Sequence, residues 1–272
     1  MFTFNCRGRL LIITKPIVMG IINVSPDSFY EQSTVATTSA ALQLAEKMLK
    51  EGATILDIGG QSTKPGTENI GAKEELARVI PAIEAITKQF PESFISIDTY
   101  HAEVAKAAVS AGAVIVNDIS AGTLDSSMID IVASLNVPYV VMHMRGTPTT
   151  MQQQNDYDDM LLEILEFFIQ KTNECSKAGI KDLIIDPGFG FAKNIEQNFT
   201  LLKNMQIFKI LQKPLLAGLS RKSTIYKTLG ISPEEALNGT TVLNTIALQN
   251  GACILRVHDV KEAVEAIELL QK

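Results

Sequence analysis

Several kinds of residue are scarce in this sequence of 272 residues. It has three cysteines, Cys6, Cys175 and Cys253, which form no CxxC pair and no spacing typical of metal ligands. An odd number of cysteines without a secretory segment is typical of a reducing compartment, so we interpret the three thiols as structural. Only three histidines are present, and no cluster of histidine and cysteine suggests a zinc site.

Long apolar runs and an excess of positive charge are also missing. No run reaches the roughly 18 apolar residues of a membrane helix, and residues 1–16 lack the apolar stretch and cleavage site of a secretory signal. The net charge of -6 argues against nucleic acid or an anionic membrane as a partner, since either would favour a basic face. We therefore expect a soluble, cytoplasmic protein that binds neither.

The chain contains short apolar runs that each lead into polar residues. These runs are IVMGIIN, TILDIGG, FISID, VIVND, YVVMH, LIID, LLAGLS and ILRVH. Segments with the apolar period of a helix lie between them. These segments are residues 38–51, 74–88, 102–111, 126–135, 157–178, 196–205, 223–229, 239–249 and 261–270.

Strand and helix thus alternate about eight times without a break in composition. This pattern favours a closed (β/α)8 TIM barrel over an open, doubly wound sheet, and the length suits a barrel of about 250 residues. We expect one α/β domain over residues 1–272, with the barrel in residues 16–272. Residues 2–13 alternate around Arg7-Gly8-Arg9, so residues 1–15 are predicted to form a hairpin that closes the N-terminal mouth of the barrel.

A parallel barrel brings the C-terminal ends of all its strands to one face, so the polar residues should converge on one cleft. The connections after the first two runs, residues 24–38 and 59–73, are long and rich in Ser, Thr, Gly and Pro. Loops at this face can close over a substrate. A disordered insertion is the alternative, but the polar stretches NVSPDS and QSTKP favour a functional role.

Eight ordered motifs resemble those of the bacterial dihydropteroate synthases, over residues 16–269. They are MGIINVSPDSF (19–29), LDIGGQSTKPG (56–66), ISIDTY (95–100), VNDIS (116–120), VMHMRGTPTTM (141–151), DPGFGFAK (186–193), GLSRKS (218–223) and RVHDV (256–260). The resemblance implies a transferase of folate biosynthesis that joins 4-aminobenzoate to (7,8-dihydropterin-6-yl)methyl diphosphate and releases diphosphate. It also implies Mg²⁺ as cofactor, a homodimer and a target of sulfonamides.

The family pattern implies which residues bind the pterin. At the matching positions are Asp98, Asn117, Met142, Asp186 and Lys222. The amino-pyrimidinone edge of a pterin has adjacent donors and acceptors, which carboxylates and amides can match. Asp98 and Lys222 are also expected to be catalytic. The carboxylates of Asp98 and Asp186 would stabilise the positive charge that develops on the pterin when diphosphate departs, and Lys222 would lie on the acceptor side of the ring. The alternatives are a helix N-cap for Asp98 and ordinary core packing for Met142.

The resemblance places the diphosphate near the last strand, where Arg256 and His258 lie together in Arg-Val-His. A guanidinium offers a bidentate fork, and the helix that follows offers free N–H groups. Thr63 is implied as a further diphosphate contact. Asn23 is the implied ligand of Mg²⁺, since its amide oxygen is a hard ligand. It is also implied to contact the diphosphate.

The 4-aminobenzoate site is implied at Thr63, Pro65, Phe191 and Ser223. Ser223 offers a hydroxyl and nearby backbone N–H groups to the substrate carboxylate, and Phe191 offers an aromatic wall. Asp27 and Thr63 are further implied catalytic residues. We expect Asp27, Thr63 and Lys64 to affect turnover more than pterin binding, because closure of their loops would exclude water from the reactive cation.

Four positions depart from the family pattern. Lys64 stands where Arg is more frequent and lacks its planar fork, and Gln61 stands where Glu is common. His101 replaces a residue that is often strongly basic, and we expect it on the surface of a helix. Ala192 stands where Gly is common. Outside the motif roles, Asp118 is expected to cap a helix, and the role of His143 stays open.

Three other functions compete with the synthase. Another pterin-binding barrel enzyme, such as a methyl-transferring domain, could share the pterin residues but would not need the Ser-Arg-Lys-Ser and Arg-Val-His segments. A non-catalytic pterin-binding paralogue should have lost the catalytic residues of the loops, yet this sequence keeps Asn23, Asp27, Thr63 and Lys222. A Schiff-base aldolase built on Lys222 is disfavoured, because the neighbouring Arg221 does not give an apolar setting.

Overall fold

The predicted apolar runs form a closed parallel barrel in a computed structural model of the chain, which describes residues 1–24, 34–61 and 70–272. Around the barrel the order is β10 (Ala252–Val257), β3 (Ile17–Asn23), β4 (Ile55–Gly59), β5 (Phe94–Asp98), β6 (Ile115–Asp118), β7 (Tyr139–Met142), β8 (Leu183–Asp186) and β9 (Leu215–Ala217). All paired neighbours are parallel, so the predicted TIM barrel is confirmed.

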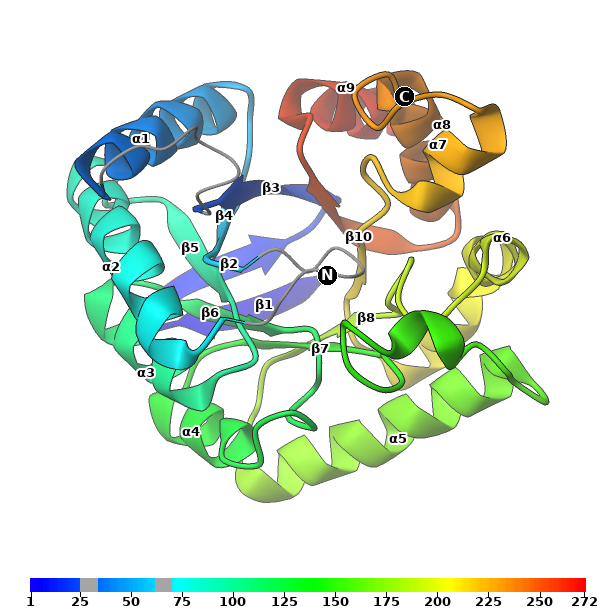
Figure 1. Cartoon of the computed structure of the whole chain (residues 1–272), viewed down its shortest axis with the longest axis horizontal. Helices are drawn as coiled ribbons and strands as arrows, with labels where there is room; N and C mark the ends of the chain where they lie inside the picture. Colours follow the sequence, from blue (N-terminus) through cyan, green and yellow to red (C-terminus); the bar gives the residue numbers. More distant parts are fainter. Residues whose placement is uncertain (25–33, 62–69) are drawn as a thin grey trace.

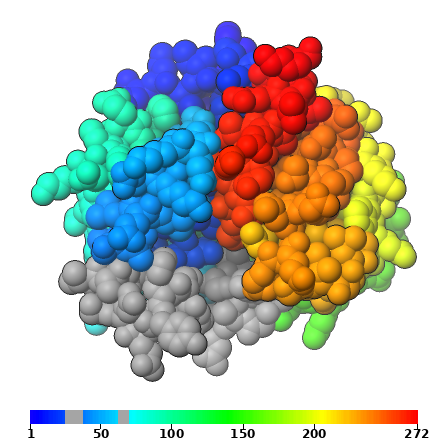
Figure 2. All heavy atoms as spheres, turned by 90° about the horizontal axis from the view of Figure 1, so that it is seen from above, coloured from blue at the N-terminus to red at the C-terminus, as the bar shows by residue number. Residues whose placement is uncertain are grey.

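Helices follow the strands and form a ring outside the barrel (Figure 1). They are α1 (Thr34–Lys50), α2 (Ala72–Gln89), α3 (Ala102–Ala111), α4 (Met128–Leu135), α5 (Met160–Ala178), α6 (Ile195–Asn204), α7 (Ser223–Leu229), α8 (Leu237–Gln249) and α9 (Val260–Leu270), with 3-10 turns η2 (Met151–Gln153) and η3 (Met205–Leu211). Figure 2 shows the ring closing where α9 lies beside α1.

Helix starts were predicted less well than helix existence. The helix expected from residue 157 begins at Met160, because Asp159 caps it by accepting a hydrogen bond from the Leu162 N–H. Likewise α1 begins at Thr34 rather than 38, and α4 at Met128 rather than 126. Apolar periodicity locates the face that packs, whereas the cap residue decides where the helix begins.

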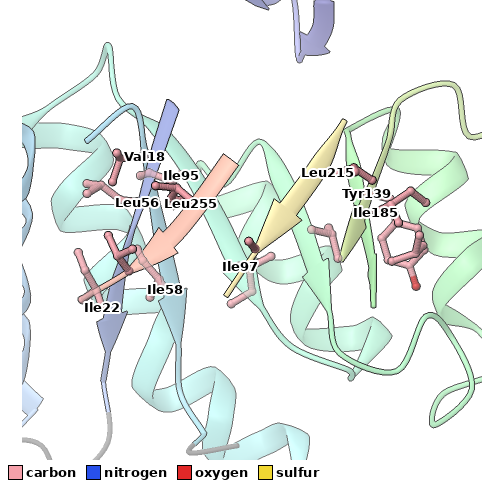
Figure 3. Packing of buried hydrophobic residues seen from close by; sticks show 14 of the residues in the cluster. Val18, Ile22, Leu56, Ile58, Ile95, Ile97, Tyr139, Ile185, Leu215 and Leu255 are labelled. Atoms are coloured by element: carbon pink, nitrogen blue, oxygen red, sulfur yellow. The ribbon is translucent and has the colours of Figure 1, made fainter. Parts of the chain in front are cut away.

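Side chains on each strand alternate between the helical layer and the barrel interior. Val18, Ile22, Leu56, Ile58 and Leu255 belong to one buried cluster with helix residues, and Figure 3 shows them gathered between β3, β4 and β10 and the helices beside them. The alternate residues point into the barrel and form a second cluster at its N-terminal half. Each strand is a continuous apolar run in the sequence because one of its faces packs on the helices and the other faces the barrel interior.

The N-terminal hairpin consists of β1 (Phe2–Cys6) and β2 (Arg9–Ile13), which pair antiparallel. Arg7 and Gly8 have φ of 55° and 89°, as a two-residue turn of type I′ requires. One face of the hairpin is buried in the interior cluster. Its members there are Phe4, Cys6, Leu11 and Ile13, packed with Met19, Ile55, Val140, Ile184, Leu216 and Ile254 of the strands. The hairpin thus closes the N-terminal end of the barrel, as predicted.

The three cysteines are free thiols, and Cys6 and Cys175 are buried. Burial raises the pKa of Cys6 to about 12 and that of Cys175 to about 11. Such thiols stay protonated at neutral pH and are poor nucleophiles, in agreement with a structural role. In the part of the chain that the structure describes, no helix is long and apolar enough to span a membrane.

Candidate active site

The C-terminal half of the barrel interior is polar where the N-terminal half is apolar. In the strand register Gly59 pairs with Asp98 and Asp98 with Asn117, so these residues lie at one level. The side chains that line this end come from predicted positions on separate strands. They are Asn23, Asp98, Asn117, Met142, Asp186 and Arg256. Asp98, Asn117 and Asp186 are between 4% and 7% exposed, so any charge they carry acts with little screening from water.

A carboxylate that the sequence did not indicate as a site residue connects this layer. Asp57, in the middle of β4, is fully buried and accepts hydrogen bonds from Arg256 Nε at 2.6 Å and Asn117 Nδ2 at 3.0 Å. Arg256 also donates from Nη2 to Asp98 at 2.5 Å. Arg256 therefore bridges two acidic residues from neighbouring strands. The only sequence feature that could have indicated Asp57 is an acidic residue inside the apolar run TILDIGG.

The pKa values of these groups follow from burial and from each other. Burial raises the pKa of Asp98 to about 7, against the opposing effect of the Arg256 guanidinium. Burial disfavours charge on Arg256, but the carboxylates of Asp57 and Asp98 raise its pKa above the ordinary value. Arg256 thus remains charged while Asp98 titrates near neutrality.

Asp186 and Lys222 form the opposite side of the site. Asp186 accepts the backbone N–H of Gly188 at 2.8 Å, and Lys222 Nζ donates to the Phe189 carbonyl. Burial raises the pKa of Asp186, while Lys222 lowers it. Burial also lowers the pKa of Lys222 to about 8, with Asp186 acting in the opposite direction. Lys222 Nζ lies 4.8 Å from the centroid of the Phe191 ring, so the predicted pterin lysine and aminobenzoate wall are adjacent.

A second buried lysine supports the loop that carries Phe191. Lys193, 3% exposed, donates from Nζ to His143 Nδ1 at 3.1 Å and to the carbonyls of Gly188 and Phe191, each at 3.0 Å. Three acceptors match the three N–H bonds of an ammonium group. Burial lowers the pKa of Lys193 to about 7 and that of His143 to about 2. His143, whose role the sequence left open, is therefore a neutral structural residue.

The last two strands bring together the predicted anion-binding residues and their supports. His258 Nδ1 lies 3.0 Å from Ser220 Oγ, and the His258 N–H donates to the same oxygen at 3.2 Å. Arg221 makes a bidentate pair with Asp259 at 2.8 and 2.9 Å, which joins the loop after β9 to the start of α9. Ser223 begins α7 and is half-buried.

Asn23 and Asp98 flank Gly59 at the ends of adjacent strands. A Cβ built on Gly59 would lie 3.6 Å from Asp98 Oδ2 and 3.7 Å from Asn23 Oδ1. Asp98 Oδ2 is already paired with Arg256, so the hard oxygen that remains for a cation here is the amide oxygen of Asn23. An oxygen of this kind fits Mg²⁺, which prefers oxygen and completes its shell with water and substrate phosphate.

Apolar side chains extend from the polar layer towards Phe191. Met142 is 3% exposed and belongs to a buried cluster with Tyr100, Ile119, Met144, Met151, Phe191 and Ala192. Ala192 has φ of 49°, a left-handed conformation that explains why Gly is common at this position in the family. The Tyr100 hydroxyl donates to Gln61 Oε1 at 3.0 Å, so the departure at Gln61 is accommodated by a neutral pair.

Two predictions about residues outside the site were wrong. Asp118 caps no helix: it accepts from Ser120 and Gly122 N–H groups and from the Tyr139 hydroxyl, and so it fixes the turn after β6. His101 is half-buried immediately before α3, with Nε2 3.3 Å from the Ile70 carbonyl, and is not a surface residue of the helix.

Asp98, for which a helix cap was the alternative, lies before α3 and pairs with Arg256 instead. The predicted roles of Asp27, Thr63, Lys64 and Pro65 fall on residues outside those that the structure describes.

Known proteins resemble this chain over nearly its whole length. The family model for pterin binding enzymes matches residues 19–258. Dihydropteroate synthase of Escherichia coli is 43% identical over 267 residues, which are 97% of this chain and 94% of that protein. A Yersinia pestis dihydropteroate synthase, solved with a sulfonamide drug complex, has a TM-score of 0.93 and 40% identity, covering 99% and 98% of the two chains. One from Xanthomonas albilineans, solved with 4-aminobenzoic acid, has a TM-score of 0.92 and 42% identity, covering 99% and 97%.

Proposed function

The chain belongs to the pterin-binding enzymes and, among them, to the dihydropteroate synthases, and we propose that it condenses 4-aminobenzoate with (7,8-dihydropterin-6-yl)methyl diphosphate. The products are 7,8-dihydropteroate and diphosphate, so the enzyme is a transferase of folate biosynthesis. One observation carries the proposal beyond family membership. Asp98, Asn117, Asp186 and Lys222, separated by up to 124 residues in the sequence, gather at one end of the barrel with Arg256.

The pterin is proposed to bind against Asp98, Asn117 and Asp186, with Met142 packed on the ring and Lys222 on its acceptor side. Carboxylate and amide oxygens accept hydrogen bonds from the amino and ring N–H groups of the amino-pyrimidinone edge. A positive charge that develops on the pterin is stabilised by the buried carboxylates of Asp98 and Asp186. Both are held by hydrogen bonds, so they need little reorganisation during the reaction.

The diphosphate is proposed to bind at Asn23, Arg256 and His258, with Thr63 added from the sequence alone. Arg256 contributes a permanent charge, and the Ser220 contacts orient the His258 ring. Mg²⁺ bound at Asn23 would supply neutralisation of charge on the leaving group. The bond from the pterin methylene to the diphosphate oxygen breaks with its electron pair on that oxygen.

The amine of 4-aminobenzoate then attacks the methylene carbon and forms the new C–N bond, with loss of a proton from nitrogen. Phe191 is proposed as a wall for the aminobenzoate ring and Ser223 as a hydroxyl donor to its carboxylate. Support comes from the relative solved with 4-aminobenzoic acid and from the short distance between Phe191 and Lys222. From the sequence alone, we further propose that Pro65 and Thr63 complete the aminobenzoate site. We also propose, on the same basis, that Asp27 and Thr63 act in turnover.

Release of diphosphate from the pterin substrate tests this function. We expect release to need both 4-aminobenzoate and Mg²⁺ and to stop in the presence of a chelator. Asn23→Ala should raise the Mg²⁺ concentration required by about tenfold or more, in line with the loss of a metal-binding group. Release without 4-aminobenzoate would favour another pterin enzyme, and pterin binding without any release would favour a non-catalytic paralogue.

Three further features remain proposals. We propose that residues 1–272 form one domain of hairpin and barrel and that the enzyme acts in the cytoplasm. We also propose a homodimer through helices late in the barrel, and large apolar side chains that are exposed there support it. They are Leu229 on α7, Val242 on α8 and Leu269 on α9. Sedimentation velocity at micromolar concentration would give twice the chain mass of 29.6 kDa if the dimer forms.

A further inference from the structure

We propose that Asp57 is a positioning residue that fixes the orientation of the Asn117 amide and of the Arg256 guanidinium, and thereby determines which hydrogen-bonding edge of a ligand the site accepts. The inference rests on the proposed pterin site. Asp57 is fully buried, and one of its oxygens, Oδ2, receives both Asn117 Nδ2 and Arg256 Nε. Its partners lie 60 and 199 residues away in the sequence, on β6 and β10.

The Asn117 amide has a donor end and an acceptor end, and the contact with Asp57 decides which is which. A carboxylate paired with a guanidinium can only accept hydrogen bonds, so the amide must present its NH₂ group to Asp57. Gly59 pairs with Asp98 and Asp98 pairs with Asn117, so Asn117 and Gly59 lie at the same level of the barrel. Asp57 lies two residues before Gly59 and is therefore closer to the N-terminal end. The NH₂ group therefore points down the barrel interior, and Oδ1 is directed to the C-terminal end.

This orientation gives the site a uniform hydrogen-bonding pattern. Asn117 Oδ1 joins the carboxylates of Asp98 and Asp186, so three acceptors from three strands face the ligand. Such a set matches adjacent N–H donors, as in a 2-amino-4-oxo pyrimidine edge. A 2-oxo analogue replaces the amino donor with an acceptor and leaves buried groups unpaired, which a site of this kind rejects strongly.

Asp57 acts on Arg256 through the same oxygen. Arg256 uses Nε for Asp57 and Nη2 for Asp98, so its guanidinium plane is fixed by two carboxylates on adjacent strands. Loss of the charge at position 57 leaves Asp98 as the remaining carboxylate within hydrogen-bond distance of Arg256 in the described part of the chain. Asp57 thus links Asn117, which is proposed to bind the pterin, to Arg256, which is proposed to bind the diphosphate.

The substitution Asp57→Asn tests the proposal because it keeps the shape and allows the Asn117 amide to turn over. The readout is the ratio of dissociation constants for 6-hydroxymethylpterin and its 2-oxo counterpart, 6-hydroxymethyllumazine, by calorimetry. We expect the wild type to prefer the pterin by at least about 100-fold, and Asp57→Asn to prefer it by less than about tenfold. The exchange variant Asp57→Asn with Asn117→Asp restores an acceptor at position 117, so it should recover the preference.

Asp118→Asn is the matched control. Asp118 is also fully buried and adjacent to Asn117, but its partners are Ser120, Gly122 and Tyr139. This variant should melt at a lower temperature and keep the wild-type preference. An Asp57→Asn variant that weakens both ligands equally would show a merely structural role and overturn the proposal. A wild type that binds no pterin would instead contradict the proposed function.

A measurement on the wild type covers the case in which Asp57→Asn does not fold. The side-chain NH₂ protons of Asn117, followed by NMR, should exchange with solvent at least about 100-fold more slowly than those of the exposed Asn204, without any ligand. Exchange at the same rate as Asn204 would mean that Asp57 does not hold the amide, and the proposal would fall.

Discussion

Asp98 and Lys222 have pKa values that burial displaces towards each other, to about 7 and about 8. The proposed chemistry needs Asp98 as a carboxylate, which exists above its pKa, and Lys222 as an ammonium group, which exists below its pKa. We therefore predict that kcat/KM for the pterin substrate follows a narrow bell with a maximum between pH 7 and 8. A pH series of initial rates at saturating 4-aminobenzoate and Mg²⁺ measures it.

Lys222→Arg separates the two limbs of this profile. Arginine keeps its charge throughout the accessible pH range, so the alkaline limb should disappear while the acidic limb stays. The rate at the maximum should fall by about tenfold or more, because the guanidinium does not reproduce the contact of Nζ with the Phe189 carbonyl. An alkaline limb that persists unchanged in Lys222→Arg would show that another group titrates there.

Individual site residues differed in how far the sequence could predict them. Asn23, Asp98, Asn117 and Asp186 were predictable because each ends an apolar run, and strand ends converge in a barrel. Asp57 and Lys193 were not, since their roles depend on partners from other segments. Asp57 forms its salt bridge with Arg256, which is 199 residues away in the sequence. No local pattern encodes such a contact.

At the scale of elements, the loop after β8 is held from within by Lys193. Three acceptors surround its Nζ, and two of them are carbonyls of the same loop. At Gly188 a Cβ would lie 2.0 Å from the His143 carbonyl oxygen, and φ is 75°, so the loop has no room for a side chain there. The position of Phe191 thus depends on Lys193 and on the close approach of Gly188 to β7.

We predict that Lys193→Met raises the KM for 4-aminobenzoate by about tenfold and changes the dissociation constant of the pterin much less. The substitution preserves length but leaves the Phe191 carbonyl and the His143 imidazole nitrogen without the Lys193 donor, which costs about 1–3 kcal/mol for each group left unpaired. The Gly188 carbonyl keeps the Phe191 N–H as a donor. Steady-state kinetics and pterin calorimetry give the two quantities. Lys50→Met is the control, because its ion pair with Glu46 is exposed. Equal losses for both substrates would argue against a local effect on the loop.

Elements as a whole were predicted well in type and less well in extent. The alternation around Arg7-Gly8-Arg9 predicted the hairpin, because the buried residues of β1 and β2 alternate with exposed ones such as Leu10 and Ile12. The first residue of a helix was predicted wrongly where the residue that caps it, such as Asp159 before α5, is not part of the apolar pattern. The roles of turns, such as the one fixed by Asp118, also escaped prediction because they depend on contacts with neighbouring strands.

At the scale of the whole molecule, the barrel interior changes from an apolar layer closed by the hairpin to a layer of buried charge at the other end. The apolar layer contributes stability, and the charged layer carries the proposed function. Buried charge is costly unless paired, so the stability of the fold should depend on pH through the groups that lack full compensation. Glu75 is such a group outside the substrate contacts.

Glu75, on α2, is 1% exposed and accepts a hydrogen bond from Thr99 Oγ1 at 2.9 Å. Burial raises its pKa from 4.5 to about 7. Between these values the folded protein holds a proton that the unfolded chain has lost, so stability falls as pH rises through this window. We predict that Glu75→Gln removes this penalty, and that its stability advantage over the wild type grows by roughly 2 kcal/mol between about pH 5.5 and pH 8.

Urea unfolding of both proteins at the two pH values measures the difference. Glutamine keeps an oxygen for the Thr99 hydroxyl, so the comparison isolates the charge. Glu74→Gln is the control one residue away, because Glu74 is exposed in its pair with Arg78 and should show no growth of this kind. A difference between wild type and Glu75→Gln that stays constant with pH would mean that Glu75 ionises as freely in the folded protein as in the unfolded chain. The pH dependence of the fold would then have to come from the other buried acids whose pKa values burial raises, which are Asp98, Asp118 and Asp186.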